Sequence, residues 1–106
     1  MAERFGLIAK ITAHPGKGDE LAEVLLDAAS EMDDSLPGCE LYVISRSPDE
    51  PDAIWVTEVW TDRESHAASL TLDSVKAVIE RGRALIAGFS DRVETIPVGG
   101  KGLGGA

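Results

Sequence analysis

The chain has 106 residues and contains neither asparagine nor glutamine, so no side chain can offer an amide group as a hydrogen-bond donor. Basic residues are also scarce, with 10 Lys and Arg against 19 Asp and Glu and a formal net charge of -9. Phosphate backbones and anionic membrane surfaces both require clustered basic side chains. We therefore expect neither a nucleic acid nor a membrane as a partner.

Cysteine and histidine are nearly absent. Cys39 is the single cysteine, which excludes a disulfide within the chain, and we interpret it as a small, buried or edge thiol. The two histidines, His14 and His66, lie far apart in the sequence, and neither has a carboxylate at the spacing of a ligand motif. The sequence therefore predicts no metal site.

Long apolar runs are missing as well. No segment approaches the ~20 apolar residues that cross a bilayer, and the first ten residues, MAERFGLIAK, lack the apolar stretch of a secretory signal. The length leaves room for a single domain. We expect a soluble, cytoplasmic protein with one domain in residues 1–98 and a glycine-rich tail in residues 99–106.

Four segments have the pattern of β-strands. Residues 5–13 alternate with a period of two. Residues 39–46 and 53–60 are rich in β-branched and aromatic side chains and lie close enough in sequence to pair as a hairpin. Residues 89–97 are the candidate for a last strand.

Helical patterns lie between these strands. Apolar residues recur at helical spacing over residues 18–35. Thr61 and Glu64 fit the S/T-x-x-E capping box, which predicts a short helix starting there. Asp73 is a second candidate N-cap, followed by a longer helix that Gly88 is expected to stop.

The resulting order, β-α-β-β-α-β, predicts an α+β, ferredoxin-like fold with a four-stranded antiparallel sheet and helices on one face. The third strand is nonetheless apolar on both sides, since Ile54, Val56 and Trp60 alternate with Trp55 and Val59. An uncovered apolar sheet face is typical of an interface. We therefore expect two copies to pair sheet to sheet as a homodimer.

Several motifs resemble the antibiotic biosynthesis monooxygenase (ABM) domains of the dimeric α+β barrel superfamily. The features that carry the resemblance span nearly the whole chain: Glu58-Val59-Trp60, Asp62-Arg63-Glu64-Ser65-His66 with Ala68-Ser69-Leu70, the segment Val75 to Phe89 ending in IAGF, and the tail from Pro97 to Leu103. The resemblance implies a cofactor-independent monooxygenase that oxidises a quinol-like or polycyclic phenolic substrate directly with O2. Side-chain amides, which some family members use, have no counterpart in this chain.

Such a reaction requires a base, donors for the developing oxyanion, and walls that exclude water. His66 is the candidate base or anion stabiliser, or alternatively a surface histidine bonded to a carboxylate. Glu58 shares a strand face with Trp60, so we expect a buried carboxylate with a partner or a raised pKa, or alternatively a carboxylate at an edge near solvent or in a salt bridge. The predicted catalytic residues are therefore His66 and Glu58.

The residues expected to bind an aromatic substrate are Trp60, Tyr42, Val56 and Leu70. For Trp60 and Tyr42, the alternative role is packing. We further expect His66 to point inward, beside Trp60 and Glu58, because Ser69 and Leu70 follow it at i+3 and i+4.

The sequence leaves open two other functions of the domain and two arrangements of its tail. The domain could be a non-catalytic dimeric module that binds small aromatic ligands, or, less favoured, a haem-binding or haem-degrading relative with His66 as the axial ligand. The tail 99–106 either lacks fixed structure or crosses the dimer interface with Leu103 as an apolar anchor. It is not a phosphate-binding loop, because no Ser or Thr follows Lys101.

Overall fold

The structure, a computed structural model of the chain, describes residues 3–31 and 38–103. Within these two ranges the chain forms four strands and three helices in a β-α-β-β-α-α-β order. The elements are β1 (Phe5–Ala13), α1 (Gly18–Glu31), β2 (Cys39–Arg46), β3 (Ala53–Trp60), α2 (Arg63–Ser69), α3 (Asp73–Arg83) and β4 (Ile86–Thr95).

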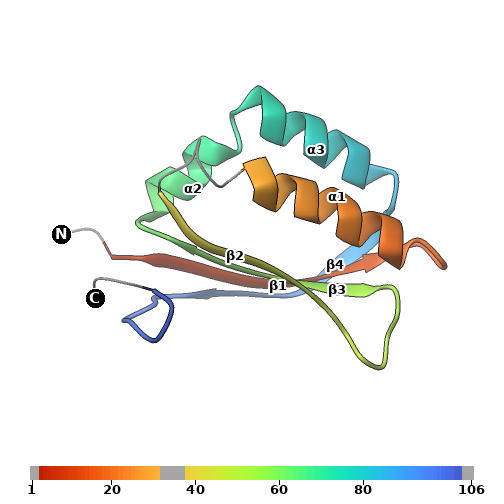
Figure 1. Cartoon of the computed structure of the whole chain (residues 1–106), viewed down its shortest axis with the longest axis horizontal. Helices are drawn as coiled ribbons and strands as arrows, with labels where there is room; N and C mark the ends of the chain where they lie inside the picture. Colours follow the sequence, from red (N-terminus) through yellow and green to blue (C-terminus); the bar gives the residue numbers. More distant parts are fainter. Residues whose placement is uncertain (1–2, 32–37, 104–106) are drawn as a thin grey trace.

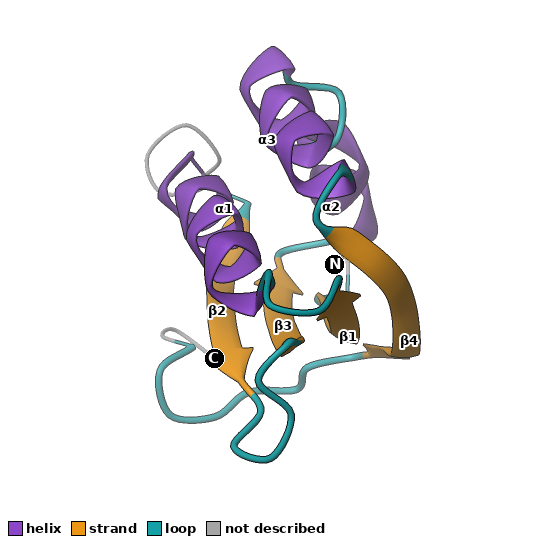
Figure 2. Ribbon diagram, turned by 90° about the vertical axis from the view of Figure 1, so that its right-hand side faces the viewer, coloured by secondary structure: helices purple, strands orange, loops and turns teal. Residues whose placement is uncertain are grey.

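The strands form one antiparallel sheet in the order β2-β3-β1-β4. All three helices lie on the same face of this sheet, with α1 and α3 side by side (Figures 1 and 2). The predicted α+β, ferredoxin-like fold is confirmed for the single chain. None of the described helices is long and apolar enough to span a membrane.

The core lies between the helices and the covered face of the sheet. The fully buried side chains Leu21, Ile54 and Trp60 come from α1 and β3. The residues of β1 that lie opposite Ile54 and Trp60 are Ile11 and Phe5, which are also buried. The period-2 pattern of these strands therefore points one set of apolar side chains at the helices, as expected.

The strands at 5–13, 39–46 and 53–60 end where the sequence predicted, but the third helix and the last strand do not. We expected the helix to continue to Gly88, whereas α3 ends at Arg83 and β4 begins at Ile86. The reason is tertiary, because Ile86 pairs with Ala13 and the Leu85 carbonyl accepts the His14 N–H at 2.9 Å. The helix 18–35 is observed as far as Glu31, and residues 32–35 lie outside the described part.

None of the described helices lies on the other face of the sheet (Figures 1 and 2). Val43 on β2 and Val93 on β4 are exposed on it by 42% and 51%. The segment 97–103 passes beneath this face (Figure 1), and a Cβ added to Gly6 would stand 2.9 Å from the Pro97 ring. An apolar face is therefore left open in the single chain, partly crossed by this segment.

Candidate functional site

Helix α2 begins with a different cap from the predicted one. The Asp62 carboxylate accepts the Ser65 N–H at 2.7 Å, so Asp62 is the N-cap. The predicted Thr61–Glu64 capping box is wrong, because the Thr61 N–H donates to the Gly38 carbonyl at 2.8 Å. A carboxylate is also a stronger acceptor for the helix N-terminus than a hydroxyl.

The second predicted cap is wrong as well. Asp73 is the first residue of α3, and the N-cap is Leu72, which makes no side-chain hydrogen bond to the helix. A carboxylate in the first turn still favours the helix through its dipole.

His66 points from α2 into the interior, in the predicted direction. Its ring centroid lies 4.8 Å from that of Phe5 and 5.5 Å from that of Trp60, the latter edge-on. Its side chain is only 15% exposed. The buried Ser69 hydroxyl donates to the His66 carbonyl at 2.6 Å, which secures this turn of the helix.

Glu58 lies under His66 on the covered face of β3. One oxygen of its carboxylate, Oε1, accepts the indole N–H of Trp60 at 3.0 Å and lies 3.7 Å from His66 Nε2. The Glu58 side chain is only 11% exposed. The indole of Trp60 and the imidazole of His66 therefore approach the same carboxylate oxygen of Glu58. Trp60 and Glu58 belong to β3, and His66 belongs to α2.

Burial acts on both titratable groups in the same direction, toward the neutral form. Loss of solvation raises the pKa of Glu58, which the Trp60 hydrogen bond and then Arg92 partly oppose. Loss of solvation also lowers the pKa of His66, and Arg92 lowers it further. The pKa of Glu58 and the pKa of His66 thus move toward each other.

A cavity of about 290 Å³ opens beside this pair, between the sheet and the helices. Its walls are mainly apolar, and Leu70, Ile79 and Phe89 are exposed side chains among them. The polar groups in the walls include Glu58 and His66. The lining residues are Ile11, Val24, Leu25, Ala28, Tyr42, Glu58, His66, Ser69, Leu70, Val75, Val78, Ile79, Gly82, Ile86 and Phe89.

Four of the six predicted site residues line this cavity: His66, Glu58, Tyr42 and Leu70. Leu70 is not buried as expected but 46% exposed. Trp60 and Val56 are not among the lining residues. Trp60 is 0% exposed and contacts the site through Glu58 instead, and Val56 packs in the core around Leu21.

The sequence did not single out the apolar wall contributed by α1, α3 and β4. The helical spacing of Val75, Val78 and Ile79 was visible, but a core face and a cavity wall have the same pattern. Arg92 and Glu94 on β4 were also missed. Their only signal is the alternation of charged residues along an edge strand.

Tyr42 and Cys39 flank Glu58 from β2. Burial raises the pKa of the Tyr42 hydroxyl and the nearby Glu58 charge raises it further, so the phenol stays protonated. Burial raises the pKa of Cys39 to about 11, which leaves a thiol of low reactivity. Among the described residues, no group of three His, Cys, Asp or Glu side chains could hold a metal ion.

Fold and cavity together define an α+β, ferredoxin-like domain with a mainly apolar pocket between its two layers. The model of the antibiotic biosynthesis monooxygenase family matches residues 4–81, and the chain belongs to this family. The resemblance seen in the sequence is confirmed.

Solved structures agree with this assignment. An antibiotic biosynthesis monooxygenase-family protein from Chloroflexus aurantiacus J-10-fl is 50% identical, with a TM-score of 0.87 over 95% of this chain and 99% of that chain. One from Caulobacter crescentus CB15 is 24% identical, with a TM-score of 0.84 over 92% of each chain.

A more distant structure shares the fold. A variant of SnoaB, a cofactor-independent oxygenase from Streptomyces nogalater, is 19% identical, with a TM-score of 0.78 over 94% of this chain and 98% of that chain. No match was found among curated proteins.

Proposed function

We propose that the protein is a cofactor-independent monooxygenase that oxidises a quinol-like or phenolic aromatic substrate with O2 in the cavity beside Glu58 and His66. The observation that carries this proposal is the buried Glu58–His66 pair, 3.7 Å apart, at the wall of an otherwise mainly apolar cavity. The SnoaB structure, which shares the fold, supports it by analogy.

In the proposed reaction, neutral His66 removes a proton from a hydroxyl or an acidic ring C–H group of the substrate. Glu58 stabilises the imidazolium that forms, as a carboxylate does beside a catalytic histidine. The resulting anion carries negative charge on a ring carbon, that carbon forms a bond to O2, and the proton returns to give a hydroperoxide. Breakage of the O–O bond then releases water and leaves a carbonyl. Written for the keto tautomer of the phenol, a ring CH2 and O2 become C=O and H2O.

The size of the cavity limits the part of the substrate that enters. A dry cavity of about 150 Å³ holds one benzene ring, so about 290 Å³ accommodates two fused rings. Further rings or an apolar chain would extend past the exposed Leu70 and Phe89. We therefore expect a one- or two-ring head group to bind beside the Glu58–His66 pair.

The protein is also proposed to act as a homodimer. Val43 and Val93 are exposed on the helix-free face of the sheet, and Trp55 points to the same face. Pairing of two such faces would remove these apolar side chains from water. The cavity lies on the other face, so each chain of the dimer would hold its own cavity.

Haem suits the arrangement poorly. The His66 Nε2 atom, the atom expected to bind iron, faces a Glu58 oxygen at 3.7 Å. A metalloporphyrin would have to displace the carboxylate from that position.

Isotope labelling tests the proposed activity against a purely binding role. The protein is incubated with a panel of benzene and naphthalene quinols under ¹⁸O2, and oxygen uptake and product mass are followed. A monooxygenase places one labelled atom in the product and the other in water. Tight binding of a quinol without uptake or label would instead identify a non-catalytic aromatic-binding module.

A further inference from the structure

The pairing of β1 with β4 slips by one residue beside the cavity. Ile8 pairs with Val93 and Lys10 pairs with Ser90, so two residues of β4, Asp91 and Arg92, stand opposite Ala9. Asp91 has a φ of 51°, the left-handed region that non-glycine residues seldom adopt. This is a β-bulge, a feature often found where a strand re-aims a side chain at a functional site.

The bulge changes which side chains of β4 face the helices. Phe89, opposite Ile11, lines the cavity from the covered face. In a regular strand, residues three apart lie on opposite faces. The extra residue Asp91 instead brings Arg92 to the same face as Phe89. Glu94, which pairs with the buried Leu7, also lies on this face.

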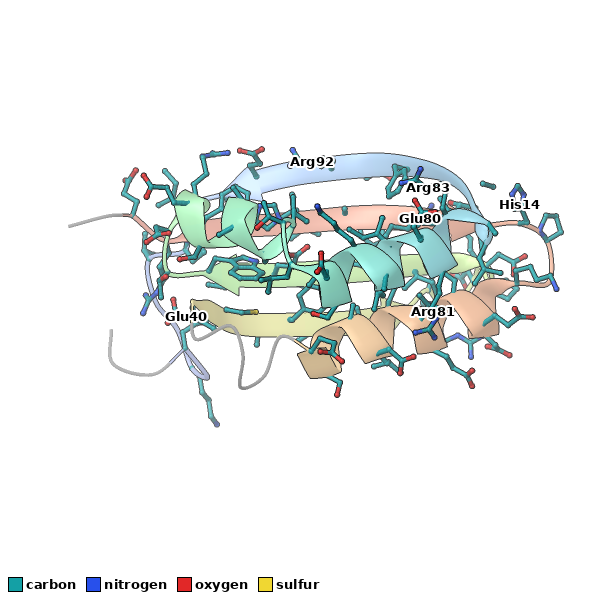
Figure 3. All side chains as sticks on the ribbon, turned by 90° about the horizontal axis from the view of Figure 1, so that it is seen from above. His14, Glu40, Glu80, Arg81, Arg83 and Arg92 are labelled. Atoms are coloured by element: carbon teal, nitrogen blue, oxygen red, sulfur yellow. The ribbon has the colours of Figure 1, made fainter. Side chains whose placement is uncertain are left out.

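Arg92 is held on that face by a series of ion pairs. Its Nη1 atom lies 2.8 Å from Glu94 Oε2, and the other Glu94 oxygen accepts from Arg63 Nη2 at 2.7 Å. Arg63 in turn lies over the Phe5 ring, which packs against His66. Figure 3 shows Arg92 on β4, level with the junction of α2 and α3.

Two guanidinium groups share one carboxylate here, so this group of three side chains has a net positive charge. The cavity walls lack such a charge, because none of the described lining residues is Lys or Arg. A site that forms a substrate anion needs one nearby. We propose that Arg92 is a positioning residue of this site: the bulge turns its side chain to the covered face of the sheet, the face that carries Glu58, where its charge favours an ionised substrate.

The charged groups around the pair agree with this role. The charged groups that face His66 are Glu58 on β3, Arg63 on α2, and Arg92 and Glu94 on β4. Loss of solvation is the largest cause that lowers the pKa of His66; Arg92 lowers it next, Glu94 opposes this, and Arg63 lowers it further. Arg92 also opposes the effect of burial on Glu58. A neutral imidazole beside an ionised carboxylate is the arrangement from which His66 accepts a proton.

Nuclear magnetic resonance tests the effect on the free protein, with no ligand required. The chain has two histidines, and His14 lies near the far end of the molecule from α2 (Figure 3), so it is an internal reference. In Arg92→Met, we expect the titration midpoint of His66 to rise, with the His14 resonances as the internal reference. Arg92→Lys, which keeps the charge, should restore the wild-type midpoint.

Two further variants isolate the role of Arg92. Arg46→Met removes an arginine of equal exposure, 55%, that pairs with Asp19 at 2.9 Å, and it should leave His66 unchanged. Because loss of Arg92 also unpairs one Glu94 oxygen, Arg92→Met is repeated with Glu94→Gln. Part of the rise must persist in the double variant. A His66 midpoint equal to wild type in Arg92→Met would overturn the proposal.

The effect on a ligand rests on the proposed function and has its own test. A nitrophenol, whose colour reports its ionisation, is titrated in complex with wild type, Arg92→Met and Arg46→Met. At a pH near its midpoint, we expect the ratio of phenolate to phenol to fall at least about threefold in Arg92→Met alone. Equal ratios would contradict the role of Arg92, whereas absence of binding to wild type would count against the proposed cavity ligand and leave the His66 titration to decide on Arg92.

Discussion

The indole N–H of Trp60 and the imidazole of His66 approach the same carboxylate oxygen of Glu58, at 3.0 Å and 3.7 Å. Trp60 is two residues from Glu58 on β3, so the geometry of the strand determines the hydrogen bond between them. His66 comes from α2, so the packing of that helix on the sheet determines how the imidazole approaches the carboxylate. Trp60 therefore orients the acid, and His66 approaches both the acid and the aromatic ring of Phe5.

A double-mutant cycle measures the Trp60–Glu58 hydrogen bond. Trp60→Phe, Glu58→Met and the double variant are unfolded with urea near pH 7. Hydrogen bonds to charged groups contribute about 1.5–3 kcal/mol, so we expect a coupling free energy of about 1–3 kcal/mol between the two sites. Additive effects, with no coupling beyond about 0.5 kcal/mol, would show that the indole does not orient the carboxylate.

Glu58→Gln tests the burial of the carboxylate through pH. The folded-state pKa of Glu58 is raised, so its contribution to stability is fully present below the unfolded pKa and is lost as pH rises through the folded pKa. A glutamine side chain cannot ionise, so Glu58→Gln should gain stability relative to wild type as pH rises from about 4 to about 7.

The measurement is urea unfolding at both pH values and one protein concentration, with Glu23→Gln on the exposed side of α1 as the control. A difference between Glu58→Gln and wild type that does not change with pH would argue against a shifted carboxyl group.

The N-cap of α2 can be tested by comparing substitutions at the neighbouring residues Thr61 and Asp62. Asp62 accepts the Ser65 N–H, whereas the Thr61 hydroxyl lies 3.3 Å from the Ser65 hydroxyl and caps no helix N–H among the described residues. Asp62→Ala should therefore lower the unfolding temperature by more than Thr61→Ala, because it leaves a helix N–H without its acceptor. Thermal unfolding followed by circular dichroism decides the order, and a larger loss in Thr61→Ala would restore the cap predicted from the sequence.

The proposed dimer is tested on the helix-free face. Val93→Asp places a charge on that face, and Leu26→Asp places one at a similarly exposed position on α1, 54% against 51%. Light scattering at micromolar concentration should give twice the 11.2 kDa chain mass for wild type and Leu26→Asp, and a smaller particle for Val93→Asp. A wild-type particle of 11.2 kDa would contradict sheet-to-sheet pairing.

Sequence patterns predicted the fold because its strands and helices differ in period. The β1, β2 and β3 ranges follow from alternation and from Pro and Gly breakers, which are local signals. The end of α3 does not, since the apolar spacing continues past Arg83 and only pairing of Ile86 with Ala13 stops the helix. The local sequence pattern cannot show whether the helix ends at Arg83 or continues to Gly88, because the pairing of strands from distant parts of the chain determines where it ends.

Part of the site was also predictable from local periodicity. Glu58 and Trp60 share a strand face by spacing alone, and the i+3 and i+4 neighbours of His66 indicated its direction. The bulge at Asp91 depends on the register between β1 and β4, which no residue near Arg92 signals in the sequence. The contribution of Arg92 therefore emerges only from the folded chain.

The central claim is that His66 removes the proton that starts the reaction with O2. His66→Phe keeps an aromatic ring against Phe5 and Trp60 but cannot accept a proton, and His14→Phe is the matched control at the exposed histidine. With an accepted quinol near pH 7, we predict that oxygen uptake falls about 100-fold or more in His66→Phe and is unchanged in His14→Phe. Undiminished uptake in a folded His66→Phe protein would contradict the account.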